Sequence, residues 1–195
     1  MFSLATLQCM AQHRTSALPD APAPAIPVAE PALYSPPTQS NRFKNYVLTT
    51  FGPVAMVEAA VRGGIQQKRD KPSEWPQGGQ GYADRFGSAM GEIAVRGTTE
   101  YVLSDLFKED LRMLPCGCSD SKFKLALADT FTAKRGEGGG RSLSIARIAG
   151  PVSGSLVAYK TWYPSGTPRN EIASEIGLNY GFVFLGNLIH ESTHH

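Results

Sequence analysis

Apolar residues recur at helical spacing through most of the chain downstream of residue 41. The first such face is short and comprises Phe43, Tyr46, Val47 and Phe51. Gly52 and Pro53 end it, and Pro53 suits the first turn of a second helix that we expect to run to about residue 68. A loop rich in Pro and Gly follows at 70–81.

The longest predicted helix covers residues 82–108. Its apolar stripe comprises Phe86, Met90, Ile93, Ala94, Gly97, Tyr101 and Leu106. Its charged residues lie mostly elsewhere on the helical wheel and comprise Asp84, Arg85, Glu92, Arg96 and Glu100. These charges argue against a simple membrane span for this segment. We expect them to form a water-exposed or interfacial face.

A short helix and a small β-hairpin are predicted in the next part of the chain. The helix covers residues 121–129, and alternating residues at 130–135 and 141–145 flank a glycine-rich tip. A further helix begins near Ala146 and ends near Trp162. Because Pro151 lies within it, this helix either bends there or begins there. Thr167 and Pro168 then open the last helix, which extends to about Glu191.

Small residues recur every fourth position on four of these helices. The four ridges are Ala146, Gly150, Gly154 and Ala158; Ala55, Ala59 and Gly63; Ala83, Gly87 and Gly91; and Ala173, Gly177 and Gly181. Such ridges let two helix backbones approach closely. Since Gly inside a helix costs about 1 kcal/mol relative to Ala, its repeated use needs a packing reason.

The sequence therefore predicts a mainly α fold: a bundle of closely packed helices with small-residue ridges, plus a small β-hairpin. The residues expected to pack helices are Ala59, Gly63, Gly87, Gly91, Gly150, Gly154, Ala158, Gly177 and Gly181. The ridges could contact one another within the chain, a second subunit, or lipid, and the pattern leaves these three alternatives open.

The N-terminal part of the chain differs in composition from the rest. Residues 1–12 resemble a shortened signal or leader, and residues 13–41 form a tether rich in Pro and Ala that we expect to be disordered. One helical domain at 42–195 follows. We expect a location in the cell envelope, periplasmic or associated with the outer membrane.

Charge and hydropathy limit the partners of this domain. The formal net charge is only +2 and the Lys and Arg residues are scattered, which argues against nucleic acid. No run of 18 residues is both strongly apolar and uncharged, and the best stretch, 176–189, is too short to span a membrane unaided. The expected partners are a membrane surface or further copies of the chain.

One motif carries strong chemical meaning, the sequence His190-Glu191-Ser192-Thr193-His194. On a helix, His190 and His194 lie one turn apart and can bind one Zn²⁺, with Glu191 placed to activate a water molecule. The motif is close to the end of the sequence, so a third zinc ligand would have to come from upstream. A polar helix end explains the same residues, because His is favourable near a helix C-terminus.

Other polar stretches have weaker chemical interpretations. Cys116 and Cys118 are too close for an ordinary structural disulfide, and their redox state is left open; with Cys9 they are the only cysteines. The stretch 136–142 lacks the spacing of a phosphate-binding loop and is interpreted as a hairpin tip. The charged run 108–112 is either a buried ion-pair cluster or a solvated segment.

Several short motifs occur together in one order along the chain. They are Thr50-Phe51-Gly52-Pro53, Ser73-Glu74-Trp75, Gln80-Gly81-Tyr82, Glu109-Asp110-Leu111-Arg112, Gly139-Gly140-Arg141-Ser142, Ser144-Ile145-Ala146-Arg147-Ile148-Ala149-Gly150 and Trp162-Tyr163-Pro164. With them, the chain resembles a family of bacterial secreted or envelope proteins that has no established activity. The resemblance implies export and no catalytic residue. His190 and His194 fall where that family does not require histidine.

Three functional hypotheses follow from these observations. The first is a non-enzymatic cell-envelope protein with a structural or membrane-associated role, and no cofactor. The alternative is a zinc-dependent hydrolase built on His190, Glu191 and His194. A third is a binder of an apolar ligand held between the helices.

Overall fold

A computed structural model describes residues 34–113, 121–136 and 139–193. The fold is mainly helical, as predicted, with one small antiparallel sheet. Its helices are α1 (Gln39–Phe51), α2 (Pro53–Arg69), α3 (Gly79–Leu106), α4 (Lys122–Phe131), α5 (Ile145–Thr161) and α6 (Arg169–Thr193). Its strands are β1 (Glu109–Asp110), β2 (Thr132–Arg135) and β3 (Gly140–Leu143).

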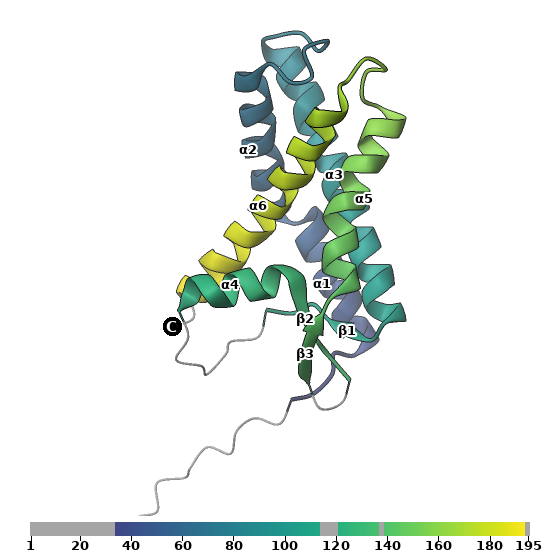
Figure 1. The fold of residues 1–195 in the computed structure, drawn as a ribbon, viewed down its shortest axis with the longest axis vertical. Helices are drawn as coiled ribbons and strands as arrows, with labels where there is room; N and C mark the ends of the chain where they lie inside the picture. The colour runs from purple at the N-terminus through teal and green to yellow at the C-terminus, as the bar shows by residue number, and fades with distance from the viewer. Residues whose placement is uncertain (1–33, 114–120, 137–138, 194–195) are drawn as a thin grey trace, which may run out of the picture. The chain divides into compact units, whose positions relative to one another are not determined.

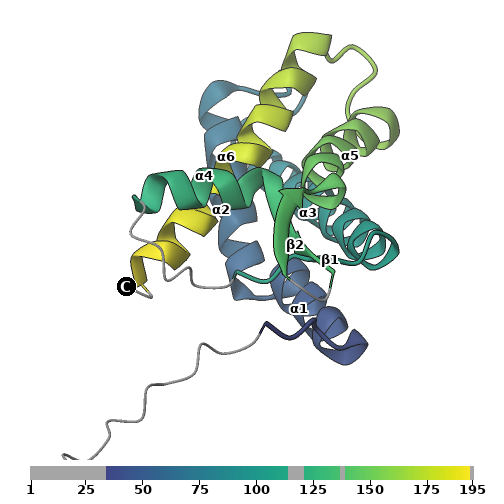
Figure 2. The ribbon, with the colours of Figure 1, turned by 60° about the horizontal axis from the view of Figure 1, so that its bottom comes forward.

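Helix α3 is the centre of the bundle. It packs against α2 on one side and α5 on another, and α6 packs against α4 and α5 (Figure 1). Turning the molecule brings α4 and the three strands forward, and they lie at the same end as α1 (Figure 2). The loops that join α2 to α3 and α5 to α6 lie at the opposite end (Figure 1).

The three strands form a sheet in the order β1-β2-β3. The expected hairpin is present: Thr132 pairs with Leu143, and Arg135 pairs with Gly140. Gly136 and Gly139 adopt positive φ angles of 71° and 62° at its tip, a conformation that glycine allows without strain. The sequence did not predict β1, in which Glu109 pairs with Arg135.

A local capping signal determines where α5 begins. Ser144 caps α5 by accepting a hydrogen bond from the Arg147 N–H at 3.1 Å, so the helix begins before Pro151 and includes it. Because α5 is continuous through Pro151, all four of its ridge residues lie on one helix, and all four are buried.

The described fold also includes residues upstream of 42. The Tyr34 hydroxyl donates to Asp110 Oδ2 at 3.1 Å, and Arg112 donates to the Ser35 carbonyl at 2.8 Å. Tyr34 also lies under the Lys134 ammonium, 5.4 Å from the ring centre. Part of the stretch expected to be a tether is therefore packed against the sheet.

The apolar core is small and consists mainly of alanine. It comprises Ala55, Ala59, Ala89 and Ile93, with Phe86 and Met90 packed against them. The largest fully buried side chains are instead polar, with Arg62, Arg85, Gln66 and Glu92 among them. Many large apolar side chains are exposed, up to 77% for Val54. The interior of the bundle is therefore more polar than much of its surface.

Candidate functional site

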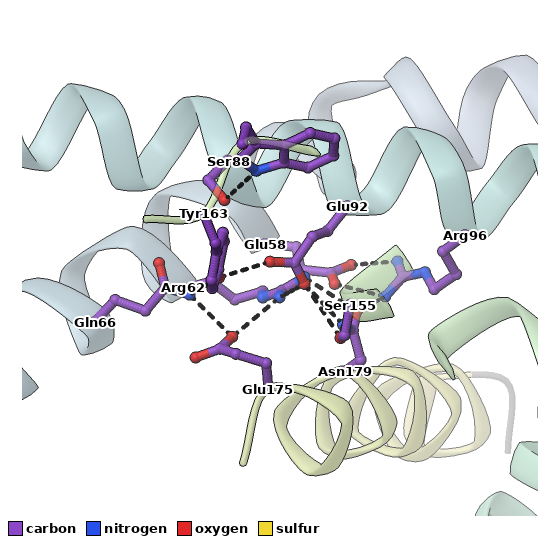
Figure 3. A network of polar contacts seen from close by, with 11 residues as sticks. Glu58, Arg62, Gln66, Ser88, Glu92, Arg96, Ser155, Tyr163, Glu175 and Asn179 are labelled. Atoms are coloured by element: carbon purple, nitrogen blue, oxygen red, sulfur yellow. Dashed lines mark hydrogen bonds and ion pairs between the residues drawn. The ribbon is translucent and has the colours of Figure 1, made fainter. Parts of the chain in front are cut away.

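Three helices direct polar side chains into the interior at four-residue spacing, which places them on one face of each helix. The set, which we call the polar axis, is Glu58, Arg62 and Gln66 on α2; Glu92, Arg96, Glu100 and Ser104 on α3; and Glu175 and Asn179 on α6. Figure 3 shows that most of these side chains converge between the helices.

The centre of the polar axis is an ion pair between Arg62 and Glu92. Arg62 Nη2 lies 2.6 Å from Glu92 Oε2, and neither side chain is exposed to solvent. Asn179 joins the two, because its Oδ1 accepts from Arg62 at 3.0 Å and its Nδ2 donates to Glu92 at 3.1 Å. Asn179 Nδ2 also donates to Ser155 of α5 at 2.9 Å (Figure 3). Four helices are thus connected through one buried cluster.

Towards the α5–α6 loop, the axis continues through neutral donors. Gln66 donates to Glu175 at 2.9 Å, and the Tyr163 hydroxyl donates to Glu92 Oε1 at 2.9 Å. Burial, together with the neighbouring Glu92 and Glu175 carboxylates, raises the pKa of the Tyr163 phenol well above its usual value. Tyr163 therefore remains a donor over the physiological pH range.

Towards the end of the bundle that carries the sheet, Arg96 makes the next ion pair. Its two terminal nitrogens each lie 2.8 Å from an oxygen of Glu58, a two-point contact of the kind that holds a guanidinium in a fixed orientation. Arg96 also donates to Asn179 at 3.2 Å. Glu92, Arg96 and Glu100 therefore alternate in charge along α3.

The expectation that the α3 charges form a water-exposed or interfacial face was wrong for most of them. Arg85 and Glu92 are fully buried and Arg96 is 8% exposed. Only Asp84 is exposed, whereas Glu100 is half-buried. These charges face inward because carboxylates, guanidinium groups and amides on α2 and α6 lie opposite them, and a partnered charge can be buried.

Several predicted ridge residues lie where two helices cross. A Cβ atom added at Gly154 would lie 2.7 Å from the Glu92 carbonyl oxygen, and one at Gly63 would lie 3.2 Å from the Phe86 nitrogen. At Gly150 it would lie 2.5 Å from Glu100 Cγ. Ala59 and Ala158 are fully buried. These small residues let α2, α3 and α5 approach closely enough for the polar axis to close.

The other predicted ridge residues have different surroundings. A Cβ atom at Gly91 would lie 3.1 Å from the Trp162 ring, so this glycine accommodates an aromatic side chain instead of a helix backbone. At Gly87, Gly177 and Gly181 an added Cβ would have no described atom within 4 Å. The ridge of α6 therefore faces away from the rest of the described chain.

Arg85 forms a separate cluster at the α2–α3 loop. It is fully buried and donates to the carbonyl oxygens of Lys71, Pro72, Pro76 and Gly81 at 2.8–3.1 Å. It also donates to Gln67 at 2.7 Å. These hydrogen bonds satisfy carbonyl oxygens of the α2–α3 loop, which has none of the described β-strands beside it to supply donors. The cluster therefore has a structural role.

A second acidic cluster lies at the start of α5. Glu109 accepts from the Ser144 hydroxyl at 2.6 Å and from the backbone N–H groups of Ile145 and Ala146 at 3.1 and 3.2 Å. Although burial acts in the opposite direction, these hydrogen bonds and the one from Arg135 lower the pKa of Glu109. Of the two interpretations of the charged run 108–112, the buried cluster is correct, because Glu109 and Asp110 are almost fully buried.

A cavity of about 760 Å³ opens between α2 and α6. These two helices meet through Arg62 and Asn179, and the cavity lies beyond that contact, towards the C-terminal end of α6. Its apolar and aromatic lining comprises Pro37, Tyr46, Leu48, Val54, Val57, Val61, Tyr101, Leu111, Met113, Phe182, Val183, Leu185 and Ile189. Its charged lining comprises Arg42, Glu58, Arg96, Glu100, Asp110, Arg112 and Arg147.

The residues of the predicted zinc motif lie on α6 or beyond it. His190 lines the cavity, Glu191 is buried, and His194 lies outside the described residues. Within residues 34–113, 121–136 and 139–193, no group of three or more His, Cys, Asp or Glu side chains is placed to hold a metal ion. Cys9, Cys116 and Cys118 also lie outside the described ranges.

No model of a known protein family, no curated protein and no solved structure matches this chain. The site must therefore be interpreted from its own chemistry. The polar axis was not predicted from the sequence, although its signal is present: Glu58, Arg62 and Gln66 recur every fourth residue in a helix that is otherwise apolar or small-residue up to Ile65. That spacing marks a polar face but does not show whether the face is buried.

Proposed function

We propose that this protein is a non-enzymatic helical bundle embedded in a membrane of the bacterial cell envelope. The observation that carries the proposal is the distribution of polarity: charged and amide side chains occupy the interior, and large aliphatic and aromatic side chains occupy the surface. Soluble monomers show the opposite arrangement and rarely expose large continuous apolar patches. A membrane protein is expected to turn its ionisable groups inward and pair them.

The exposed apolar side chains occur on every long helix. They comprise Phe43, Val47, Leu48 and Phe51 on α1; Val54, Met56, Val57 and Val61 on α2; Val102 and Leu106 on α3; Leu156 and Val157 on α5; and Leu185 and Ile189 on α6. In water, this area would remain unfavourably hydrated at about 25 cal/mol for each Å². Contact with acyl chains removes that cost.

The exposed charges on α2, α3, α5 and α6 support the same orientation. They are Lys68, Arg69, Asp84, Lys160 and Arg169, each near the helix end that joins the α2–α3 or the α5–α6 loop. Figure 1 shows both loops at one end of the bundle. At the opposite end, α1, α4 and the strand region carry the exposed residues Lys44, Lys108, Lys122, Lys124 and Arg141. Between the two ends, no charged side chain in the described part of those four helices is mostly exposed, and Glu58 and Glu100 are half-buried.

The lengths of the helices agree with this proposal. Helix α6 has 25 residues, is long and apolar enough to cross a membrane, and reaches a mean hydropathy of 1.3 in its best 18-residue window. It extends beyond the stretch 176–189 at both ends, and the acidic residues Glu175 and Glu191 in these extensions are buried. Helix α2, with 17 residues, is about 26 Å long, close to the roughly 30 Å of a bilayer core.

The cell envelope is proposed from different observations. The leader-like residues 1–12 and the family resemblance favour export, and the part of the expected tether upstream of Tyr34 would separate the leader from the bundle. Apart from Glu100, the charges of the polar axis are mutually paired, so its geometry calls for no reaction. A structural or binding role therefore accounts better for the described residues than a catalytic one.

Membrane extraction of the full chain tests this proposal. We expect the protein to sediment with membranes, to resist extraction by sodium carbonate at high pH, and to require detergent for solubility. A matched pair of variants sharpens the test: Val54→Lys places a charge in the apolar surface, whereas Lys68→Val changes a residue at its charged boundary. Val54→Lys should reduce membrane recovery much more than Lys68→Val. A monodisperse protein obtained without detergent would refute the proposal.

A further inference from the structure

We propose that the cavity between α2 and α6 binds an anionic phospholipid, with the acyl chains on its apolar side and the headgroup at its arginine-rich end. This inference rests on the proposed membrane location. The volume of about 760 Å³ is within the range of roughly 300–1,000 Å³ that is typical of small-molecule sites.

The apolar side of the cavity is continuous with the apolar surface of the bundle. Val57 and Val61 of α2 and Leu185 and Ile189 of α6 both line the cavity and remain exposed. If the bundle lies in a membrane, a lipid chain can enter sideways between the two helices without crossing water.

Guanidinium groups of the cavity lining gather around residues 104–112. Arg42 donates to the carbonyl oxygens of Ser104 and Glu109 at 3.2 and 2.8 Å, and Arg147 donates to that of Leu111 at 2.9 Å. Carbonyl oxygens hold these arginines in position but do not neutralise them. Arg42 and Arg147 are therefore oriented cations without a carboxylate at ion-pair distance among the described residues.

The carboxylates that line the cavity do not cancel this positive charge. Glu58 is bound to Arg96 in the two-point contact described above, and Asp110 is bound to Arg112 at 2.8 Å. Glu100 remains as a third carboxylate and attracts Arg147 electrostatically without forming an ion pair, so four arginines of the lining face three carboxylates. The lining therefore has an excess of positive charge and favours an anionic headgroup over a zwitterionic one.

Two buried polar atoms of the lining residues also lack partners. Arg147 is 8% exposed and its Nε has no acceptor, and Asn187 is 1% exposed and its Oδ1 has no donor in the described chain. Both atoms are shielded from solvent, so a phosphate oxygen or a headgroup hydroxyl would reach them once these two lining side chains turn towards the cavity.

Native mass spectrometry of the full chain in a mild detergent tests this inference. We would titrate dioleoylphosphatidylglycerol and dioleoylphosphatidylcholine separately, and we expect the anionic lipid to bind at least about tenfold more tightly, a difference of about 1.4 kcal/mol. Arg147→Gln should remove most of this preference. Lys160→Gln makes the same charge change at an exposed position on the same helix and should leave it intact.

A steric variant covers the case in which Arg147→Gln fails to fold. Val57→Trp places a bulky ring at the cavity opening and should reduce binding of the anionic lipid about tenfold or more. Met56→Trp makes a similar change at the neighbouring exposed position, which does not line the cavity, and should bind normally. Equal binding of the two lipids, normal binding by Val57→Trp, or a dimer that Val57→Trp dissociates would overturn the inference. Because detergent dependence is measured separately, these results can be distinguished from a failure of the membrane proposal.

Discussion

Arg62 and Glu92 form an ion pair 2.6 Å long in which neither side chain reaches solvent. Both ions lose their hydration, so the pair is favourable only because Asn179, Glu175 and Tyr163 supply further polar contacts. Removing one partner would leave the other ion buried without a counter-charge.

Arg62→Met should destabilise the bundle by about 3–5 kcal/mol, because it leaves the Glu92 carboxylate buried without its cation. The double variant Arg62→Met/Glu92→Gln should recover part of this loss. Thermal unfolding of the detergent-solubilised protein gives the ranking, with Lys68→Met as a control at an exposed site on the same helix. A single variant as stable as the control would mean that the pair does not hold α2 against α3.

Gly154 and Gly177 form a matched pair for testing close helix packing. Gly154→Ala adds a Cβ 2.7 Å from the Glu92 carbonyl oxygen, a backbone atom that cannot move by itself, and should cost about 1–3 kcal/mol. Gly177→Ala meets no described atom within 4 Å and should gain up to about 1 kcal/mol from helix propensity.

Thermal unfolding midpoints of the two glycine variants are compared under the same conditions. If Gly177→Ala proves the more harmful substitution, the ridge of α6 contacts a second subunit. If neither variant changes the unfolding midpoint, the backbones of α3 and α5 lie farther apart at Gly154 than the structure shows.

Glu109 and Asp110 should make the protein sensitive to acid. Their ordinary pKa values are 4.5 and 3.8, and hydrogen bonds from Ser144 and Arg112 respectively lower both against the effect of burial. Because the folded-state pKa is the lower one, the stabilisation is complete above the ordinary values. It is lost as the pH falls through the lowered ones.

Glu109→Gln should therefore be less stable at neutral pH and should show a shallower loss of stability between about pH 5 and pH 2. Thermal unfolding midpoints measured across that range check this, with Asp84→Asn as the control at an exposed carboxylate. An unchanged acid slope in Glu109→Gln would show that the α5 cap is not the acid-sensitive element.

The two tryptophans should report one membrane interface. Trp75 follows α2 and Trp162 follows α5, so both lie at the same end of the bundle. Trp162 donates to Ser88 at 2.9 Å, and aromatic residues with a polar group favour the headgroup region. In vesicles, their fluorescence should be quenched more by lipids brominated near the glycerol than by lipids brominated near the chain ends.

Trp162→Phe separates the contributions of the two tryptophans, since Trp75 alone remains. The depth dependence should keep its direction in this variant. Stronger quenching by the deeply brominated lipids would place this end of the bundle inside the bilayer and contradict the proposed orientation.

The sequence predicted the helices well because their apolar residues keep a period near 3.6 over several turns. The hairpin followed from alternation around glycines. Strand β1 was missed because two residues are too few to show a period, and Glu109 and Asp110 resemble a solvated charged run. Their burial depends on Arg135 and Ser144, which are distant in the sequence.

The polar axis could not have been located by the same reasoning. A helical wheel identifies the face that carries Glu92 and Arg96, but an inward and an outward polar face have the same period. Glu92 and Arg96 are buried because Arg62 and Glu58 of α2 lie opposite them. The cavity depends on the angle between α2 and α6, a relationship that no local pattern encodes.

The alternation of charge along α2 and α3 also fixes how far the two helices slide past each other. Ridges of Ala and Gly are smooth and nearly repetitive, so packing alone would tolerate a shift of one turn. Arg62 faces Glu92 and Glu58 faces Arg96, and a one-turn shift would bring Arg62 against Arg96 or Glu58 against Glu92. In a medium of low dielectric constant, either clash is costly. The buried charges thus fix the axial register of α2 against α3, because only one alignment of the two helices pairs every opposite charge.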